Sequence, residues 1–300
     1  MLNLVTGAFG FTGKYISDLL IKKGEKVRTL TSKTDINLYN ENIEVFQYNF
    51  EDKEYLIKAM SGAEKLFNTY WIRFPYKSHT FEKVVFRTKI LIDCAKEADI
   101  KKIIHISVSN ANSKSKLNYF KYKGIVEEMI KDSKIDYFIL RPTIIFGKES
   151  ILINNIAWFL RKFPIFIVFG KGKYLVQPIF IEDIAKIAVL ESDNSANKII
   201  DIVGPEVFEF KEMVNFIKTK ISSKCKILYL PTFLFQIFIP ILNFLTKDVV
   251  LTKEELKALK ENLLYSKEEP IGQKKFTDWI EENKFDVGKE YFSELLRHYI

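Results

Sequence analysis

The chain opens with Leu2-Asn3-Leu4-Val5-Thr6-Gly7-Ala8-Phe9-Gly10-Phe11-Thr12-Gly13, and this stretch decides the fold. Its first residues are apolar and suit a short buried strand. Residues 14–23 carry apolar side chains at helical spacing, and Gly24 is placed to end that helix. A buried strand, a glycine-rich turn and a helix, in this order, form the first half of a βαβ unit. The opening stretch therefore predicts a parallel α/β architecture.

The glycine spacing predicts a nucleotide site. In a turn of this kind the first glycine permits the tight turn, the second lets the backbone approach a pyrophosphate, and the third lets the helix pack close to the strand. The free N–H groups of the helix then face the anion. The spacing is one residue looser than Gly-x-Gly-x-x-Gly. We expect Gly7, Phe9, Gly10, Phe11 and Gly13 to bind the nucleotide; the alternative is a glycine turn that binds nothing.

Composition restricts the class of protein. The 300 residues, 47% of them hydrophobic, can form one large domain or two unequal ones. The net charge of +8 comes mainly from lysines scattered among acidic residues, so we predict no nucleic-acid partner. Cys94 and Cys225 lack metal-ligand or disulfide spacing, so we predict no metal and a reducing, cytoplasmic compartment. The N-terminus carries no signal-peptide pattern, which agrees with that compartment.

Apolar runs of strand length alternate with helical patterns through the first half of the chain. This alternation predicts an α/β fold with a doubly wound parallel sheet and a smaller, mostly helical C-terminal lobe. We predict a dinucleotide-binding domain at 1–148 and a substrate lobe at 149–300. Within that lobe, 174–204 is expected to return to the sheet and to end in a last strand at 201–204.

The end of the second predicted strand distinguishes two cofactors. In this fold an Asp or Glu there holds the ribose 2′-hydroxyl of NAD. The chain instead has Thr31, Ser32 and Lys33, and hydroxyls with an ammonium suit the 2′-phosphate of NADP. We therefore predict NADP. Asp35 follows closely, so NAD stays an alternative, as does an ordinary turn without a ligand.

A second group of polar residues follows the fifth predicted strand. Ser109 comes just after it, and Tyr119 and Lys123 share one face of the next predicted helix. A nearby ammonium lowers the pKa of a phenol, so Tyr119 can exchange a proton with an oxygen that Ser109 holds. The alternative is a surface pair without a catalytic role. Tyr122 has no lysine four residues later, and His105 lies inside the apolar strand, where we expect a packed residue.

In combination these motifs resemble the extended and atypical short-chain dehydrogenases/reductases, which have a Rossmann fold. The motifs are Thr6-Gly7-Ala8-x-Gly10-x-x-Gly13, Ser109, Tyr119-x-x-x-Lys123, Leu140-Arg141-Pro142-Thr143 followed by Gly147, and Gln177-Pro178-Ile179-Phe180-Ile181-Glu182-Asp183-Ile184-Ala185. The chain is more closely similar to the atypical group that contains the nucleotide-binding accessory subunit of respiratory complex I. Stretches 68–74, 151–158 and 291–298 carry that closer similarity.

The resemblance implies an NAD(P)-dependent oxidoreductase that moves a hydride to or from a carbonyl or hydroxyl carbon. It implies that Ser109, Tyr119 and Lys123 are catalytic, that Lys123 also reaches the nicotinamide ribose, and that Asn49 and Phe50 lie at the adenine. Two alternatives stay open: a non-catalytic dinucleotide-binding redox sensor or membrane-complex subunit, and an epimerase or dehydratase that retains NAD. The segment between Ser109 and Tyr119 is short, which disfavours a large sugar-nucleotide substrate, and we expect a small, apolar one.

A long apolar run at 227–246 contains no charged residue and is flanked by Lys226 and Lys247. Its length approaches that of a transmembrane span, but Pro231 and Pro240 interrupt it, so we predict no span. Three roles stay open for this run: the roof of an apolar substrate pocket, a peripheral contact with a membrane, or a buried helix pair in the C-terminal lobe. The sequence makes no prediction of the oligomeric state.

Overall fold

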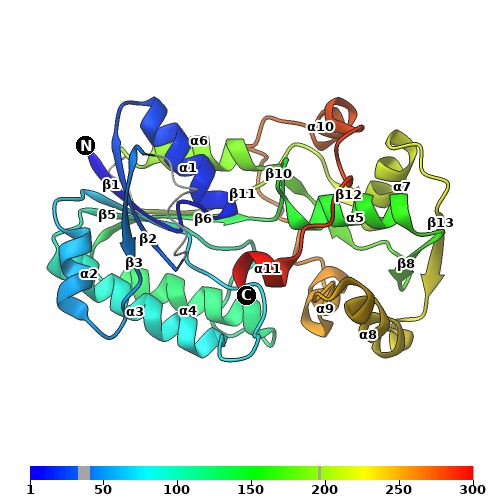
Figure 1. Cartoon of the computed structure of the whole chain (residues 1–300), viewed down its shortest axis with the longest axis horizontal. Coiled ribbons are helices and arrows are strands. Elements are labelled where there is room, and N and C mark those ends of the chain that lie inside the picture. Colours follow the sequence, from blue (N-terminus) through cyan, green and yellow to red (C-terminus); the bar gives the residue numbers. More distant parts are fainter. Residues whose placement is uncertain (33–40, 195–196, 300) are drawn as a thin grey trace. The chain divides into compact units, whose positions relative to one another are not determined.

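The computed structural model describes residues 1–32, 41–194 and 197–299 (Figure 1). The chain divides into two compact units. The first unit comprises Met1–Pro142 and Ile181–Asp201, and the second comprises Thr143–Phe180 and Ile202–Ile300. We predicted a dinucleotide-binding domain at 1–148 and a substrate lobe at 149–300. The two binding roles stay predictions.

Seven strands of the first unit form one sheet in the order β11-β6-β5-β4-β1-β2-β3. Their bounds are β1 Leu2–Thr6, β2 Lys26–Thr31, β3 Ile43–Gln47, β4 Lys65–Asn68, β5 Lys102–Ile106, β6 Asp136–Pro142 and β11 Lys198–Ile202. All neighbouring pairs from β6 to β3 are parallel. The order 3-2-1-4-5-6 is that of a Rossmann fold, so the predicted doubly wound α/β class is confirmed.

Helices cover both faces of this sheet, with α1 and α6 on one face and α2, α3 and α4 on the other (Figure 1). Their bounds are α1 Phe11–Lys22, α2 Lys53–Met60, α3 Phe81–Glu97, α4 Asn118–Asp132 and α6 Ile181–Glu191. The apolar stripes of α2, α3 and α4 pack in one core with strand residues such as Leu4, Leu66 and Ile103. Asp52 caps α2 by accepting the N–H of Tyr55 at 2.9 Å.

The strand order reverses between the neighbouring strands β1 and β4, and a Rossmann fold binds its ligand at the carboxyl ends of these strands. The carboxyl ends of these two strands are tied by side chains. Thr6 donates its hydroxyl to the Asn68 side-chain oxygen at 3.2 Å and accepts the N–H of Thr69 at 2.8 Å. These bonds hold the turn after β1 beside the loop that follows β4.

The last strand of the sheet differs from its prediction. It was expected at 201–204, but β11 runs from Lys198 to Ile202, so Val203 and Gly204 lie beyond it. A Cβ on Gly204 would lie 1.8 Å from the Pro178 carbonyl oxygen. This glycine is thus packed against another part of the backbone and has left the sheet.

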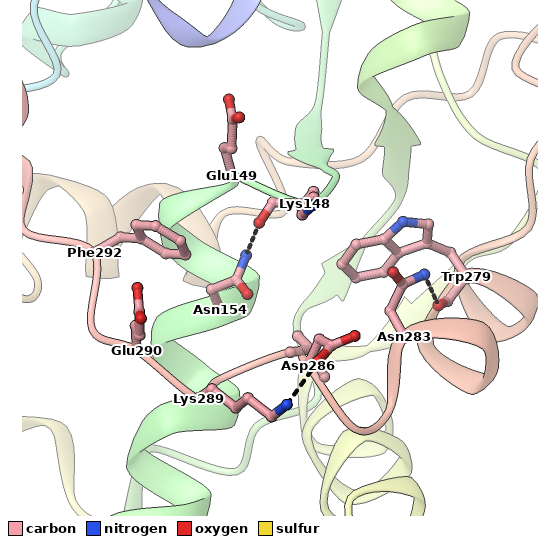
Figure 2. Close-up of a pocket in the computed structure, with 10 residues that line it drawn as sticks. Lys148, Glu149, Asn154, Trp279, Asn283, Asp286, Lys289, Glu290 and Phe292 are labelled. Carbon is pink, nitrogen blue, oxygen red and sulfur yellow. Dashed lines mark hydrogen bonds and ion pairs between the residues drawn. The ribbon is translucent and has the colours of Figure 1, made fainter.

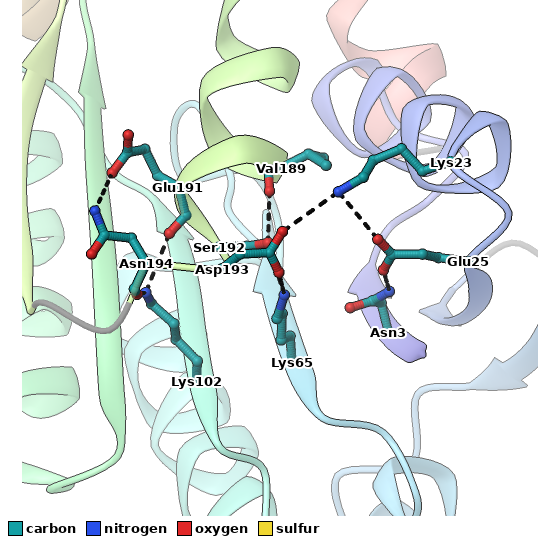
Figure 3. Close-up of polar contacts among 10 residues, drawn as sticks. All are labelled: Asn3, Lys23, Glu25, Lys65, Lys102, Val189, Glu191, Ser192, Asp193 and Asn194. Atoms are coloured by element: carbon teal, nitrogen blue, oxygen red, sulfur yellow. Dashed lines mark hydrogen bonds and ion pairs between the residues drawn. The ribbon is translucent and has the colours of Figure 1, made fainter.

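A polar network joins the elements at the amino-terminal edge of the sheet (Figure 3). Lys65, at the start of β4, is 7% exposed and forms an ion pair with Asp193 just after α6. Lys23, after α1, lies 3.5 Å from the same carboxylate. Lys102, at the start of β5, donates to the Glu191 carbonyl oxygen at the end of α6 at 3.3 Å. The network therefore fastens the ends of α1 and α6 to the sheet.

The second unit combines short strands with helices. Its strands are β7 Ile144–Phe146, β8 Ile165–Phe169, β9 Leu175–Val176, β10 Pro178–Phe180, β12 Phe208–Glu209 and β13 Lys226–Leu230. Its helices are α5 Ile151–Lys162, α7 Phe210–Lys220, η2 Thr232–Leu234, α8 Phe235–Thr246, α9 Lys253–Lys260, α10 Phe276–Asn283 and α11 Glu294–His298. Residues of α5, α7 and α10 form one core around Phe146 and Phe276. Among the described residues, none of the helices has the length and apolar character that crossing a bilayer requires.

Candidate functional site

The glycine turn has the geometry that its spacing predicts. Gly7 follows β1 with a φ of +67°, a left-handed conformation that favours glycine. Gly10 donates its N–H to the Gly7 carbonyl oxygen at 2.8 Å, which closes the turn. A Cβ on Gly13 would lie 2.2 Å from the same oxygen. Glycine at this position therefore lets α1 pack directly against the turn.

The first turn of α1 is open to an anion. Its N-cap, Gly10, provides no side-chain hydrogen bond, and the first turn carries no acidic residue. The orphan backbone N–H groups and the helix dipole therefore favour a negative charge. Phe9 and Phe11 flank Gly10 and are half-buried. The residues present fit a pyrophosphate, and the contribution of the two phenylalanines stays a prediction.

The end of β2 carries no described carboxylate. Thr31 is 4% exposed at the last position of the strand, and Ser32 follows it at the surface. Lys33 and Asp35 lie outside the described residues. An acidic group at this place would hold the 2′-hydroxyl of NAD. Neither Thr31 nor Ser32 is acidic, and this is also the reason for which the sequence favours NADP over NAD. The preference for NADP therefore stays a prediction.

The two residues predicted to lie at the adenine follow β3. Asn49 is exposed, and its side-chain oxygen accepts the N–H of Glu51 at 3.3 Å. Phe50 stacks on Tyr48 with ring centroids 5.1 Å apart, and the Arg87 guanidinium lies 4.7 Å from the Phe50 centroid. Arg87 belongs to α3, and its sequence surroundings give no signal of this contact. The adenine role of Asn49 and Phe50 stays a prediction.

The three predicted catalytic residues lie in the loop that follows β5 and in α4. Ser109 is fully buried, and its N–H donates to the Pro142 carbonyl oxygen at the end of β6 at 2.9 Å. Tyr119 lies in the first turn of α4 and is half-buried. Lys123 follows one turn later and is 3% exposed. Catalysis by these residues stays a prediction, which their placement does not test.

Lys123 lies in an unusual environment for a lysine. Its Nζ donates to the carbonyl oxygen of Ile106, the last residue of β5, at 2.7 Å. The same Nζ lies 4.4 Å from the centroid of the Trp71 ring. Burial lowers the pKa of Lys123 to about 7, although the Glu127 carboxylate acts in the opposite direction. Within the described ranges Lys123 forms no ion pair, so its ammonium is only partly compensated.

Trp71 is the main residue of this region that the sequence analysis missed. It follows β4, and its ring contacts the Tyr119 ring edge-on at 6.1 Å between centroids. Because Lys123 also lies against this indole, Trp71 contacts both residues of the predicted proton-transfer pair. The indole N–H is buried without a hydrogen-bond partner in the described part of the chain. No local pattern could identify Trp71, because β4 and α4 are distant in sequence.

An ion pair between a half-buried arginine and a buried glutamate holds α4 against the sheet. The Arg141 guanidinium of β6 donates to the Glu127 carboxylate, with its Nε at 2.9 Å, and the Ser107 hydroxyl donates to the same carboxylate. In the same helix, a Cβ on Gly124 would lie 2.3 Å from the backbone nitrogen of Ser113. The loop before α4 therefore packs directly on the helix that carries Tyr119 and Lys123.

Two residues set aside by the sequence analysis have other roles. The Tyr122 hydroxyl donates to the Glu82 carboxylate, and this hydrogen bond raises the pKa of Tyr122. A phenol with a raised pKa is a poor proton-transfer group near neutral pH. His105 is fully buried in β5, and burial lowers its pKa well below the usual value. The prediction that His105 is a packed residue is confirmed.

The second unit contains a cavity of about 390 Å³ (Figure 2). Its lining comes from the residues just before α5, from the first turn of α5, from α10 and from the loop that follows α10, and no residue of 227–246 contributes to it. Asn154 donates its side-chain amide to the carbonyl oxygens of Lys148 and Ser150, at 3.2 and 2.8 Å, and Lys289 pairs with Asp286 at 2.8 Å. Three of the polar side chains in this lining, those of Asn154, Asp286 and Lys289, thus have hydrogen-bond or ion-pair partners within the protein.

The strand order and the glycine turn define a Rossmann-type α/β protein. The chain belongs to the NmrA-like family, which it matches over residues 2–206. The predicted resemblance to the atypical short-chain dehydrogenases/reductases is therefore confirmed.

The chain is also similar to subunits of respiratory complex I. It is 26% identical over 223 residues to the mitochondrial NADH dehydrogenase [ubiquinone] 1 alpha subcomplex subunit 9 of Dictyostelium discoideum, with 71% of this chain and 62% of that protein covered. The mouse subunit is 24% identical over 227 residues, with 71% and 59% covered. The matched region thus spans about three fifths of the length of these relatives.

Solved structures with similar folds include reductases and epimerases. The NADPH-dependent quinone oxidoreductase of Escherichia coli, complexed with NADPH, has a TM-score of 0.71 at 19% identity, with 89% of this chain and 91% of that chain covered. The triphenylmethane reductase of Citrobacter, complexed with NADP(H), has a TM-score of 0.71 at 17% identity, with 94% and 99% covered. A nucleoside-diphosphate-sugar epimerase of Staphylococcus aureus has a TM-score of 0.71 at 18% identity, with 89% and 93% covered. At these identities the likeness shows the fold alone.

Proposed function

We propose that this protein is an NADP-dependent oxidoreductase that moves a hydride between a nicotinamide and a carbonyl or hydroxyl carbon of a small, apolar substrate. The observation that carries the proposal is the buried Lys123, whose pKa is lowered to about 7 on the helix that also presents Tyr119. Strongly perturbed titratable groups concentrate at functional sites. The uncapped first turn of α1 supports a bound dinucleotide, and the end of β2, where the described residues Thr31 and Ser32 are not acidic, supports NADP.

Each residue has a distinct part in the proposed mechanism. Gly7, Gly10 and Gly13 bring the α1 N-terminus close to the pyrophosphate, and Thr31, Ser32 and Lys33 hold the 2′-phosphate. The bound dinucleotide supplies or accepts the hydride. Thr31 and Ser32 contribute hydroxyl donors, and Lys33 contributes a positive charge. Asn49 and Phe50 bound the adenine, and Phe9 and Phe11 border the turn.

Proton transfer is assigned to the residues that follow β5. Ser109 donates a hydrogen bond to the substrate oxygen, and Tyr119 exchanges a proton with that oxygen through its hydroxyl. In its charged form, Lys123 stabilises the Tyr119 phenolate and reaches the nicotinamide ribose. Burial lowers the pKa of Lys123 to about 7, so its ammonium is held less firmly near neutral pH than that of an exposed lysine.

A spectroscopic assay tests this function. Purified protein is mixed with NADPH and a panel of apolar aldehydes, ketones and quinones, and the loss of the reduced-nicotinamide absorbance is followed. We expect turnover with at least one apolar carbonyl compound and less with NADH at equal concentration. Absence of turnover across the panel, together with tight dinucleotide binding, would instead favour a non-catalytic module.

A second candidate function has its own support. The similar complex I proteins are subunits of a membrane complex, and this supports a non-catalytic dinucleotide-binding redox sensor or subunit. An epimerase or dehydratase that retains NAD is a third candidate, supported by the fold alone. Mass spectrometry of gently purified protein separates them, because a tightly held dinucleotide supports the second and third candidates, whereas an empty site supports a reductase that exchanges its cofactor.

We propose the cytoplasm as the compartment of this protein. Cys94 and Cys225 are free thiols, which fits a reducing environment.

A further inference from the structure

The apolar run predicted at 227–246 folds into β13, η2 and α8, and its helix is apolar on two opposite faces. The inner face of α8 is buried, with Phe235 at 5% and Ile239 at 6% exposure, and it packs with Phe169 of β8 and Leu256 of α9. This burial accounts for one stripe of the helix. The buried-helix prediction therefore holds for the inner face only.

The outer face of this element is exposed. Its large apolar side chains recur at helical spacing on one side of η2 and α8. They are Phe233 at 73%, Ile237 at 58%, Ile241 at 52%, Phe244 at 83% and Leu245 at 59% exposure. Contiguous exposed apolar surface of this kind marks an interaction site. We call these five residues the α8 patch.

The sequence segment that leads into and contains the α8 patch carries charges of one sign. Residues 213–247 contain five lysines and no Asp or Glu. The first acidic residue after them, Asp248, is 4% exposed, because its carboxylate accepts the N–H groups of Glu294 and Leu295 at 2.8 and 3.0 Å. The apolar face is therefore bordered in sequence by cationic side chains, among them Lys226 and Lys247.

We propose that the α8 patch inserts into the surface of an anionic lipid bilayer, so that the protein binds membranes peripherally. Phenylalanine and aliphatic side chains on one face, with lysines at the border, are typical of interfacial helices. The 12 residues of α8 extend about 18 Å, well short of the roughly 30 Å hydrocarbon core, so the helix lies in the interface. This proposal does not depend on catalysis.

Two other occupants fit the patch less well. A second copy of the chain in a two-fold dimer would place the same lysine-bordered surface against itself, which brings like charges together. A protein partner would be expected at a face richer in Tyr, Trp and Arg, with polar groups for hydrogen bonds. The α8 patch has no such group among its five side chains.

Flotation with vesicles of defined composition tests the proposal. The full chain is mixed with vesicles of phosphatidylcholine alone, or with about 30% phosphatidylglycerol added. We expect binding to the anionic vesicles that decreases as salt is raised, and weaker binding to phosphatidylcholine, because screened lysine charge and apolar insertion act together. Protein that remains unbound to anionic vesicles at low salt would overturn the proposal.

Paired variants separate insertion from charge. Phe233→Ser with Phe244→Ser keeps the charge and should lower the partition coefficient about 10- to 100-fold. The matched control, Phe86→Ser with Leu190→Ser, alters side chains that are 66% and 68% exposed on α3 and α6 and should bind like the wild type. Equal loss in both pairs would show that the α8 patch has no special role.

A second pair of variants tests the lysines. Lys226→Gln with Lys247→Gln should lower binding to anionic vesicles about fivefold per lysine at low ionic strength. Lys116→Gln with Lys131→Gln, at exposed positions around α4, serves as the control with the same net charge. Analytical ultracentrifugation completes the test. A dimer that the double phenylalanine variant dissociates, without vesicle binding by the wild type, would assign the patch to a second copy.

Discussion

The two edges of the Rossmann sheet both bury lysines, but they treat the charge differently. At the amino edge, Lys65 pairs with Asp193, and Lys102 donates to a carbonyl oxygen at the end of α6 (Figure 3). At the carboxyl edge, Lys123 donates to the Ile106 carbonyl oxygen and lies over the Trp71 ring. Burial lowers the pKa of Lys123 to about 7. Burying an ammonium costs less when a carboxylate or a helix C-terminus faces it.

This difference assigns different roles to the two edges. The amino edge uses its charges to fasten helix ends, which is a structural task. The carboxyl edge leaves a charge only partly compensated beside Tyr119, and a lysine that titrates near neutral pH can respond to a ligand or a proton. The comparison predicts that substitutions at the carboxyl edge change turnover, whereas those at the amino edge change stability alone.

The largest effect is expected from Tyr119→Phe. Loss of the hydroxyl removes the proposed proton donor, so turnover should fall by about two to four orders of magnitude while dinucleotide affinity stays nearly unchanged. Steady-state kinetics on the substrate found in the carbonyl panel measure the effect. Tyr122→Phe is the matched control, since that hydroxyl is bound to Glu82 and should be dispensable for turnover. Full activity of Tyr119→Phe would end the catalytic assignment.

The pH dependence of stability should distinguish Lys123 from the amino-edge lysines. The pKa of Lys123 is about 7 in the folded chain and about 10.4 when unfolded. Between these values the unfolded chain binds more protons, so the free energy of unfolding rises with pH through this window. Compared with that of Lys123→Met, the free energy of unfolding of the wild type should rise by about 1.4 kcal/mol for each unit by which the folded and unfolded pKa values of Lys123 differ. The full rise is reached at pH values above the pKa of the unfolded chain.

Urea unfolding of both proteins at several pH values measures this gain. Lys102→Met is the comparison variant, because burial also lowers the pKa of Lys102 while nearby carboxylates, first Asp136, oppose the shift. We expect the same sign with a smaller amplitude for Lys102. A flat difference between wild type and Lys123→Met across the window would contradict the lowered pKa.

Cofactor preference is expected to be an intermediate effect. NADPH should bind more tightly than NADH by the contribution of one or two charge-assisted contacts, about 1.5 to 3 kcal/mol each at most. Ser32→Asp should shift the preference towards NADH, because a carboxylate there repels the 2′-phosphate and accepts the 2′-hydroxyl. Titration calorimetry with both dinucleotides decides the matter, and equal or tighter NADH binding by the wild type would remove the assignment to NADP.

The smallest effect is expected from Asp193→Asn at the amino edge. The Lys65 ammonium loses its carboxylate partner, but the Asp193 side chain is 54% exposed, so solvent screens the pair. We expect a loss of about 1 kcal/mol or less in the free energy of unfolding, with unchanged turnover.

The loss should also depend on pH in a defined way. The hydrogen bond from Lys65 lowers the pKa of Asp193, so this stabilisation is present above the unfolded pKa and is lost as pH falls through the folded one. Thermal unfolding near neutral pH and near pH 3 checks the result. A change in turnover would show that the two edges are not independent.

Local patterns in the sequence were enough for the fold and for candidate site residues. The glycines after β1, the apolar strand of Leu2–Thr6 and the alternation of strands with helices are short-range signals, and they predicted the parallel sheet correctly except for the bounds of its last strand. The same is true of the helix that carries Tyr119 and Lys123, because residues four apart share a helix face whatever the tertiary structure is.

Only the tertiary structure decided which residues from distant segments of the chain contact one another. Trp71, in the loop after β4, and Arg87, in α3, contact the predicted site residues Lys123 and Phe50, and no local pattern encodes contacts between such distant segments. The pKa of Lys123 depends on burial, which is a property of the packed unit. An apolar helix such as α8 gives no sequence signal for its buried side, so only its packing on Phe169 and Leu256 revealed the outer face left exposed.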